Sequence, residues 1–417
     1  MQIVFDILIF VAVLLLLIGF HEFGHLITGK LAKIPVEKFS IGFGPAIVKW
    51  KKKDTTYQLS VVPLGGYVKF KGEDFDDPEG FFAFPFGRKT ITTAAGIIAN
   101  FLLAVIIYFV IGLGWGIESP PAVLEFDESS PFAQTGFQPG DSVIAVNGKK
   151  IITISQFASM LSDKDTIDVT VIRSGERLAL KLPPADSFNL NMRLPAVIGR
   201  IIVRGPADRA GIKRGDRIIA VDEEPINTWN ELLKAVKSAD SAQALGFKWL
   251  HKGDTLSAAI TPERIKLTGD YGIGVIVHVP TRPLTFAEVI WLPIRRTGEV
   301  TFHIFTLLGK LITGKESVRN LGGVILIANL SAQSRRWGLD HLLGLLAYLS
   351  ISLAIINLLP IPALDGGRIL MFAIEKISGK RFGKKTWTIA INIGFVLIIA
   401  LLVLTLFNDV FRLITGG

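Results

Sequence analysis

Four apolar stretches constrain this 417-residue chain more than any other feature of its sequence. An α-helix rises about 1.5 Å per residue, so a run of roughly 20 apolar residues can cross the hydrocarbon layer of a bilayer. We therefore expect four transmembrane helices, at roughly residues 3–27, 93–115, 342–359 and 387–407. The first stretch lacks a basic n-region and a small-residue cleavage site, so we interpret it as a retained span rather than a signal peptide.

The composition agrees with a membrane protein and excludes several other classes. Half of the residues are hydrophobic, 19% are charged, and the mean hydropathy is +0.47. These values are too apolar for an ordinary soluble enzyme, a disordered chain or a coiled coil. Because cysteine is absent, the chain cannot form disulfides, bind zinc through thiolates or use a thiol nucleophile.

The distribution of the net charge of +9 indicates membrane topology rather than nucleic-acid binding. Residues 117–282 are neutral overall, and the excess of Lys and Arg flanks the apolar stretches. The segments 28–92 and 368–385 are strongly basic, which predicts that both face the cytoplasm. The N-terminus, the neutral block and the C-terminus then lie on the other side of the membrane, and no nucleic-acid partner is expected.

The neutral block contains an internal repeat. SPFAQTGFQPGDSVIAVNG at 130–148 resembles GPADRAGIKRGDRIIAVDE at 205–223, with a constant offset that relates Gly136 to Gly211. Each copy predicts a short helix, a glycine turn and a strand with alternating apolar residues. A second domain-sized copy is the simplest explanation.

The repeated pattern resembles PDZ domains of the bacterial type. PDZ domains bind peptides as an added strand or at a loop that holds a terminal carboxylate. We therefore expect two extramembrane α+β PDZ domains, at 117–196 and 197–282, whose partners are peptides or segments of a substrate. Two inert spacers are the alternative, because no literal Gly-Leu-Gly-Phe loop is visible.

Residues 283–337 are apolar but interrupted by charged side chains such as Arg295 and Glu299. An amphipathic helix in the membrane interface, in contact with lipids, fits this pattern better than a fifth span. This region would separate a first membrane part, at 1–116, from a second one, at 338–417. A fifth span is the alternative, and it would reverse the predicted topology.

The first span ends in His21-Glu22-Phe23-Gly24-His25, an HExxH motif. Positions four apart lie on one face of a helix, so both imidazoles can bind one Zn²⁺ while Glu22 lies beside it. Such an ion lowers the pKa of bound water, and the carboxylate takes the water's proton during attack on a carbonyl. The alternative is three polar groups packed at a helix end, which is costly beside an apolar run.

The third zinc ligand is expected to be Asp365. A zinc protease site uses three protein ligands and keeps the fourth position for water. The histidines His251, His278 and His341 are predicted to lie on the far side of the membrane. Asp365, by contrast, follows the inner end of the third span, at the depth where the first span delivers its histidines. An Asp in an ordinary polar turn is the alternative.

The residues around Asp365 fit this role. Pro360 and Pro362 end the third span, and the two glycines after Asp365 permit a tight turn that aims the carboxylate. Asn357 lies about two turns earlier, where it can hold the substrate backbone or a developing oxyanion. A plain interhelical hydrogen bond is the alternative for Asn357.

The segment 57–70 is expected to bind substrate on the cytoplasmic side. Its apolar pairs bracket Leu64-Gly65-Gly66, which predicts a membrane-associated β-hairpin with a glycine turn. A helical substrate must be opened before cleavage, and a sheet edge can pair with the unwound chain. A buried sheet is the alternative. The substrate-binding residues expected here are Tyr57, Val61, Val62, Gly65, Gly66 and Tyr67.

In the second span, Ala94, Ala95 and Gly96 predict a close helix approach. Asn100 in the same span is interpreted as a packing hydrogen bond rather than as a catalytic group.

Together these features resemble the paired signature of the site-2 intramembrane metalloproteases. The signature combines HEFGH at 21–25 in the first span with NLLPIPALDGG at 357–367 near the third. IGFGP at 41–45 and the PDZ-like repeat extend the resemblance over nearly the whole chain. It implies a metalloendopeptidase that binds zinc through His21, His25 and Asp365 and uses Glu22 as its catalytic carboxylate.

The resemblance also implies a cellular role. The fold would be a polytopic α-helical membrane protein of the bacterial inner membrane, with a cytoplasmic-side sheet and periplasmic PDZ domains. Its substrates would be single-span membrane proteins already trimmed by another protease, of the anti-sigma-factor type in the envelope stress response, and remnant signal peptides. The PDZ pair would act as a size filter.

Two other functions compete with intramembrane proteolysis. One is a non-catalytic PDZ-bearing membrane adaptor, in which the HExxH motif has a structural metal or none. The other is a metal transporter, for which the spans carry too few carboxylates to line an ion path.

Overall fold

The structure is a computed structural model that describes residues 2–73, 77, 79–126, 130, 132–161, 164–184, 191–237, 243–264, 271–318 and 321–415. The chain forms two compact units. The first unit combines Met1–Gly114 with Leu284–Gly417, and the second is Trp115–Pro283.

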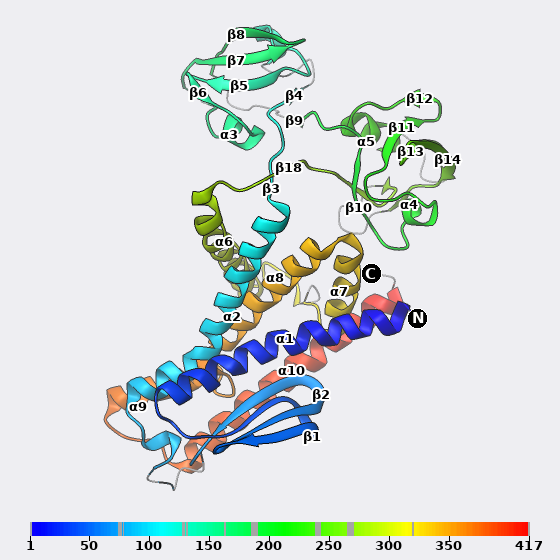
Figure 1. The fold of residues 1–417 in the computed structure, drawn as a ribbon. Coiled ribbons are helices and arrows are strands. Elements are labelled where there is room, and N and C mark those ends of the chain that lie inside the picture. The colour runs from blue at the N-terminus through cyan, green and yellow to red at the C-terminus, as the bar shows by residue number, and fades with distance from the viewer. Residues whose placement is uncertain are drawn as a thin grey trace. The chain divides into compact units, whose positions relative to one another are not determined.

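The first unit is mainly helical (Figure 1). Its helices are α1 (Gln2–Leu31), α2 (Phe86–Trp115), α6 (Phe286–Ile312), α7 (Val324–Trp337), α8 (Leu339–Leu358), α9 (Asp365–Ser378) and α10 (Lys384–Thr415). Of these, α1, α2, α8 and α10 are long and apolar enough to cross a membrane, in agreement with the four predicted spans. Among the described residues, α6, α7 and α9 do not meet that criterion.

The segment expected in the membrane interface forms α6 and α7, which both pack on other helices of the first unit. α6 begins with a capping box of Thr285 and Glu288, and Ile304 on this helix is buried in an apolar core with residues of α8. The N-terminus of α7 lies against the buried carboxylate of Asp409 in α10. Asp409 accepts hydrogen bonds from the backbone N–H groups of Gly323, Ile325 and Leu326.

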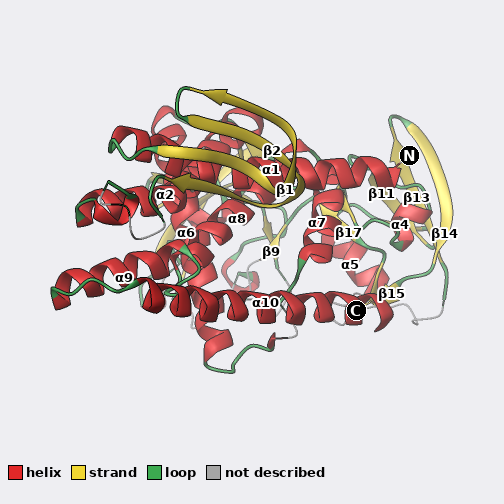
Figure 2. Ribbon diagram, turned by 90° about the horizontal axis from the view of Figure 1, so that it is seen from below, coloured by secondary structure: helices red, strands yellow, loops and turns green. Residues whose placement is uncertain are grey.

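The connection between α1 and α2 forms a sheet of two long strands, β1 (Val36–Lys52) and β2 (Thr55–Phe70). Both strands bend back on themselves (Figure 2). The first part of β1 is therefore paired on both of its sides, because residues 36–41 pair with 66–70 while residues 38–41 also pair with 56–59. The stretch 66–70 has a partner on one side only among the described residues.

The hairpin turn is not where the glycines predicted it. The predicted hairpin of residues 61–62 with 67–68 is wrong, because both stretches pair with β1, and Leu64-Gly65-Gly66 lie inside β2 near the point where it bends back. The turn that joins β1 to β2 lies at Lys53 and Asp54, and Lys53 adopts a φ of 53° there. A glycine indicates a turn only where no close packing contact explains the missing side chain. Gly66 is explained by such a contact with α1, which is described below.

α1 and α2 cross where both helices carry small residues. A Cβ on Gly24 would collide with the carbonyl oxygen of Ala95 and lie 2.8 Å from the Cβ of Ala99. A Cβ on Gly96 would collide with the imidazole of His25. The close approach predicted from the small residues of the second span is therefore confirmed, and glycine is needed on both helices.

An aromatic cluster joins the sheet, α9 and α10, and it surrounds a buried ion pair. Nζ of Lys89 in α2 lies 3.5 Å from Oε2 of Glu375 in α9 and 4.7 Å from the ring centroid of Phe372. Glu375 also accepts a hydrogen bond from the backbone N–H of Phe382. The pair therefore connects the start of α2 to α9, the helix that begins at Asp365.

The second unit contains the two copies of the repeat. Its helices and strands are β3 (Ile117–Glu118), β4 (Leu124–Glu125), β5 (Ser142–Val146), β6 (Lys149–Lys150), α3 (Ile154–Ala158), β7 (Ile167–Arg173), β8 (Glu176–Leu182), β9 (Asn191–Met192), β10 (Ile198–Ile201), α4 (Pro206–Arg209), β11 (Arg217–Val221), β12 (Glu224–Pro225), α5 (Trp229–Lys237), β13 (Leu245–His251), β14 (Asp254–Ile260), β15 (Glu263–Arg264), β16 (Tyr271–Gly272), β17 (Val275–Val277) and β18 (Thr281–Arg282). The two four-stranded sheets have equivalent orders, β6-β5-β7-β8 and β12-β11-β13-β14, and each has its own apolar core.

The repeated aspartates have the same structural role in both copies. Asp141 and Asp216 are buried, and each accepts a hydrogen bond from the backbone N–H of the residue three positions earlier. Their second partners differ, because Arg173 binds Asp141 through two nitrogens while His251 lies 2.7 Å from Asp216. The glycine-turn motif is thus held together by the carboxylate that follows it.

The Lys89–Glu375 pair allows a test of how α2 and α9 are coupled. Lys89→Met should lower the free energy of unfolding by about 3 kcal/mol, because it leaves Glu375 buried without its cation. The double variant with Glu375→Gln should lose less than the sum of the two single losses. Denaturant unfolding of the purified protein in detergent measures all four proteins of this cycle, and strictly additive losses would show that the two side chains do not interact.

Candidate metal centre

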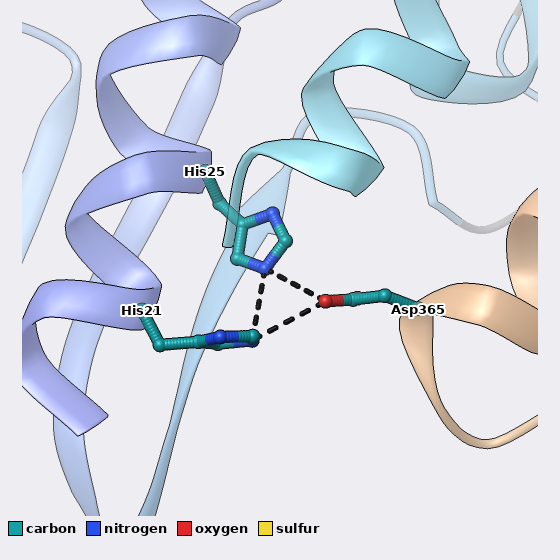
Figure 3. Close-up of side chains that lie close together, drawn as sticks. All are labelled: His21, His25 and Asp365. Atoms are coloured by element: carbon teal, nitrogen blue, oxygen red, sulfur yellow. Dashed lines mark hydrogen bonds and ion pairs between the residues drawn. The ribbon is translucent and has the colours of Figure 1, made fainter. Parts of the chain in front are cut away.

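Three side chains from distant parts of the chain meet at one point (Figure 3). His21 and His25 lie four residues apart on α1, and Asp365 is the first residue of α9. Oδ2 of Asp365 lies 3.2 Å from Nε2 of His21 and 3.3 Å from Nε2 of His25, and the two Nε2 atoms are 3.3 Å apart. All three side chains are almost fully shielded from solvent.

This triangle fits a tetrahedral zinc ion. Ligands about 2.0–2.1 Å from a tetrahedral ion lie about 3.3 Å from one another, which matches all three distances. Oδ2 of Asp365 is buried and accepts no hydrogen bond from the described residues, so a cation would satisfy it. Two imidazoles and one carboxylate form a donor set typical of catalytic zinc, with one position left for water.

The charge of Asp365 is stabilised by the imidazoles beside it. Burial, the largest single influence, would raise the pKa of this carboxyl, but the combined charge interactions and hydrogen bonds with His25 and His21 outweigh it and hold the pKa below its usual range. The carboxylate is therefore ready to act as a ligand.

Close backbone packing aims Asp365 at the histidines. A Cβ on Gly366 would collide with the carbonyl group of Leu358, and a Cβ on Gly367 would collide with that of Ile361. The glycines are thus required because the first turn of α9 packs directly on the chain that leaves α8. The sequence indicated a special turn here, and the structure gives close approach as its reason.

Two residues of α2 contact the far sides of the imidazoles. Nδ1 of His25 lies 2.8 Å from the carbonyl oxygen of Thr92, and Nδ1 of His21 lies 3.3 Å from Nδ2 of Asn100. Asn100 is fully buried, and its backbone carbonyl oxygen accepts a hydrogen bond from the hydroxyl of Ser350 in α8. Outer partners of this kind fix the orientation of metal-binding imidazoles.

Glu22 lies next to this centre and next to the sheet. It follows His21 on α1 and is buried. A Cβ on Gly66 of β2 would come within 2.8 Å of Cγ of Glu22 and 2.9 Å of Cγ2 of Ile18. The absence of a side chain at Gly66 therefore lets β2 run directly past the glutamate.

The other predicted substrate-binding residues are placed less uniformly. Tyr67 neighbours Gly66 on the stretch of β2 that has a partner on one side only, and Val61 and Val62 are exposed. Tyr57 is not at a sheet edge, because it pairs with Phe39 on one side and Trp50 on the other, and its predicted contact with substrate stays a prediction. Gly65 lies inside β2 against the ring of Phe43.

Asn357 is half-buried in the last turn of α8. Within the described part of the chain, no hydrogen bond joins it to His21, His25 or Asp365. Its predicted role toward substrate therefore stays a prediction.

The contacts that Thr92 and Asn100 of α2 make with the imidazoles were not predicted. Thr92, Gly96 and Asn100 are spaced by four residues, the same spacing as His21 and His25. Residues four apart share a helix face, so two helices that carry polar or small residues at this spacing can be expected to face each other. That match of spacings is the signal that would have identified Thr92 and Asn100.

Comparison with known proteins agrees with this chemistry. The chain matches Peptidase family M50 over residues 9–401. It is 32% identical to the regulator of sigma-E protease RseP of Escherichia coli K12, over 98% of this chain and 99% of that protein. The RseP of Salmonella typhimurium is 31% identical, over 99% of this chain and 100% of that protein. A Neisseria meningitidis relative named as a zinc metalloprotease is 31% identical, over 98% of this chain and 99% of that protein.

Among solved structures, the chain is similar to the PDZ domain of an SdrC-like protein from Listeria monocytogenes. The match covers 19% of this chain and 82% of that structure, at 20% identity and a TM-score of 0.18.

The family match includes both stretches that build the metal centre, the HExxH motif on α1 and the start of α9. The relatives extend over nearly the full length of the chain. The chain therefore belongs to Peptidase family M50, and it is a zinc-dependent metalloendopeptidase.

Proposed function

We propose that the chain cleaves transmembrane segments of other proteins at the centre formed by His21, His25 and Asp365. The observation that carries this proposal is the triangle of three ligand atoms at the separations that tetrahedral zinc requires. Because two of the ligands lie on a helix apolar enough to span a bilayer, the reaction would take place at membrane depth. The proposed function also needs a general base and a way to present the substrate backbone.

Glu22 is proposed as the general base. When bound, the zinc ion lowers the pKa of a water molecule to about 7 and polarises the substrate carbonyl. Glu22 receives the proton of the attacking water at its carboxylate and returns it to the nitrogen of the departing amine. Thr92 and Asn100 orient the two imidazoles, so the residues that bind the ion do not need to move. Asn357 remains a candidate for holding the substrate backbone.

The stretch 66–70 of β2 is proposed as the surface that opens the substrate. Peptide bonds in a helix are hidden by hydrogen bonds from residue i to i−4, and those bonds need replacement in an apolar environment. Residues 66–68 of this stretch pair with β1 on one side only among the described residues, and Gly66 lies against Glu22. A substrate strand paired there would run past the general base.

The substrate class and the topology are inferred from charge and from the relatives. Two relatives carry the name regulator of sigma-E protease RseP, so we infer that this chain acts on a single-span protein of the anti-sigma-factor type after an earlier cut. The basic segments that flank α1, α2, α8 and α10 support a cytoplasmic position for the sheet and a periplasmic one for the second unit. The two repeat copies are proposed as PDZ domains that bind or filter peptide segments of substrates, and the membrane is proposed to be the bacterial inner membrane.

Glu22→Gln separates catalysis from metal binding. The variant should bind zinc like the parent, because Glu22 is not a ligand, and its cleavage rate should fall by about 10²–10⁴-fold because the proton acceptor is gone. The measurement is mass mapping of products from a transmembrane peptide, together with zinc content by elemental analysis. Glu37→Gln, an exposed carboxylate of the sheet, is the matched control and should cleave normally. Undiminished cleavage by Glu22→Gln would favour the adaptor function, in which Glu22 has no role.

Proline scanning tests strand addition at β2. Single prolines at positions 66–69 remove backbone N–H donors, and those at outward-facing positions should lower cleavage at least about tenfold without loss of zinc. The opposite edge of the sheet, residues 47–51, provides the control positions, because it is an edge of the same sheet formed by β1. Equal loss of cleavage from both edges would show that the prolines act by unfolding the sheet and not by blocking substrate.

A further inference from the structure

The orientation of the Asn100 amide determines which nitrogen of His21 is free to bind metal, given the metal centre proposed above. A neutral imidazole carries one proton, on either Nδ1 or Nε2. Nε2 of His21 points at Asp365, where a cation would bind, and Nδ1 points at Asn100. The partner of Nδ1 therefore sets the state of Nε2.

The two orientations of the amide have opposite effects on His21. With Nδ2 of Asn100 facing the ring, as in the structure, the amide donates to Nδ1, the proton resides on Nε2, and Nε2 has no lone pair for a cation. With Oδ1 facing the ring, Nδ1–H donates to the amide and Nε2 is free to bind metal. His25 needs no such adjustment, because the carbonyl oxygen of Thr92 can only accept from its Nδ1.

A second observation supports the alternative orientation. Oδ1 of Asn100 is buried and has no hydrogen-bond partner in the described part of the chain. An unpaired buried amide oxygen is costly, and a half-turn of the amide places it on a donor.

The surroundings keep Asn100 in place during this half-turn. Its backbone is fixed by the hydrogen bond from Ser350, and the close crossing of α1 and α2 at Gly96 leaves no room for the helix to shift. Only the terminal amide can reorient.

We propose that Asn100 is a positioning residue that fixes the metal-binding tautomer of His21 by accepting a hydrogen bond from its Nδ1–H. Loss of an outer partner of a metal-binding imidazole typically weakens metal binding by about 10–100-fold. Asn100→Leu should therefore raise the zinc dissociation constant by that factor, since leucine keeps the size but provides no acceptor. Asn100→Asp, which keeps an acceptor oxygen, should bind zinc at least as tightly as the parent.

The experiment uses the full-length protein in detergent and measures zinc affinity by competition with a chromophoric chelator. Ser331→Ala is the control, because it removes a buried hydroxyl of α7 that, among the described residues, bonds only the carbonyl oxygen of Ile327, and its zinc affinity should equal that of the parent. Equal zinc affinity of Asn100→Leu and the parent would overturn the proposal, as would equal weakening by Asn100→Leu and Asn100→Asp. Absence of zinc binding by the parent would instead contradict the proposed function.

A spectroscopic measurement keeps the proposal testable if Asn100→Leu does not fold. Nitrogen-15 spectra of histidine-labelled, zinc-loaded parent, with His21 assigned by its loss in His21→Gln, report which ring nitrogen carries the proton. The proposal requires a protonated Nδ1. A zinc-loaded His21 with its proton on Nε2 would refute the proposal.

Discussion

The close crossing of α1 and α2 is the contact on which the metal centre depends. Gly24 and Gly96 remove the side chains that would hold the two helices apart, and Gly96 lies directly against the imidazoles. Only at this separation do Thr92 and Asn100 reach the histidines. Polar groups in an apolar environment are costly when unpaired, so the same contact that places the imidazoles also satisfies them.

α2 is also linked to α9, the helix that begins at Asp365, through a different contact. The carboxylate of Asp365 is fixed at one end of α9 by the packing of its glycines on the chain that leaves α8. Further along α9, the buried pair of Lys89 and Glu375 ties that helix to the start of α2. The histidines of α1 and the helix that begins at Asp365 therefore both contact α2, although none of the three residues of the centre lies on α2. This explains how residues more than 300 positions apart in the sequence can lie 3.2 to 3.3 Å from one another.

Much of this architecture could be predicted from the sequence, because hydropathy and the HExxH spacing are local signals. The four spans, the repeat and the three residues that meet at the candidate metal centre follow from such signals. The sheet was harder to predict. Gly65-Gly66 was interpreted as a turn, yet Gly66 is needed for the approach to α1, and the actual turn uses Lys53 with a positive φ. The N-terminus of α7 is likewise capped by Asp409, from a helix that comes much later in the chain, and no local pattern announces such a contact.

The polar contacts also explain why α1 and α2 adopt one register. Two apolar helices in a bilayer gain little from apolar contact alone, since lipid is as apolar as their side chains. Their register must come from close packing and hydrogen bonds. His25 contacts Thr92, and His21 contacts Asn100, so the two helices run in opposite directions at this crossing. Gly96 lies midway between Thr92 and Asn100 and faces both imidazoles. A shift by one residue would break both hydrogen bonds and place a methyl group or larger side chain against the imidazoles. The register of the helices and the geometry of the metal centre are thus set by the same few atoms.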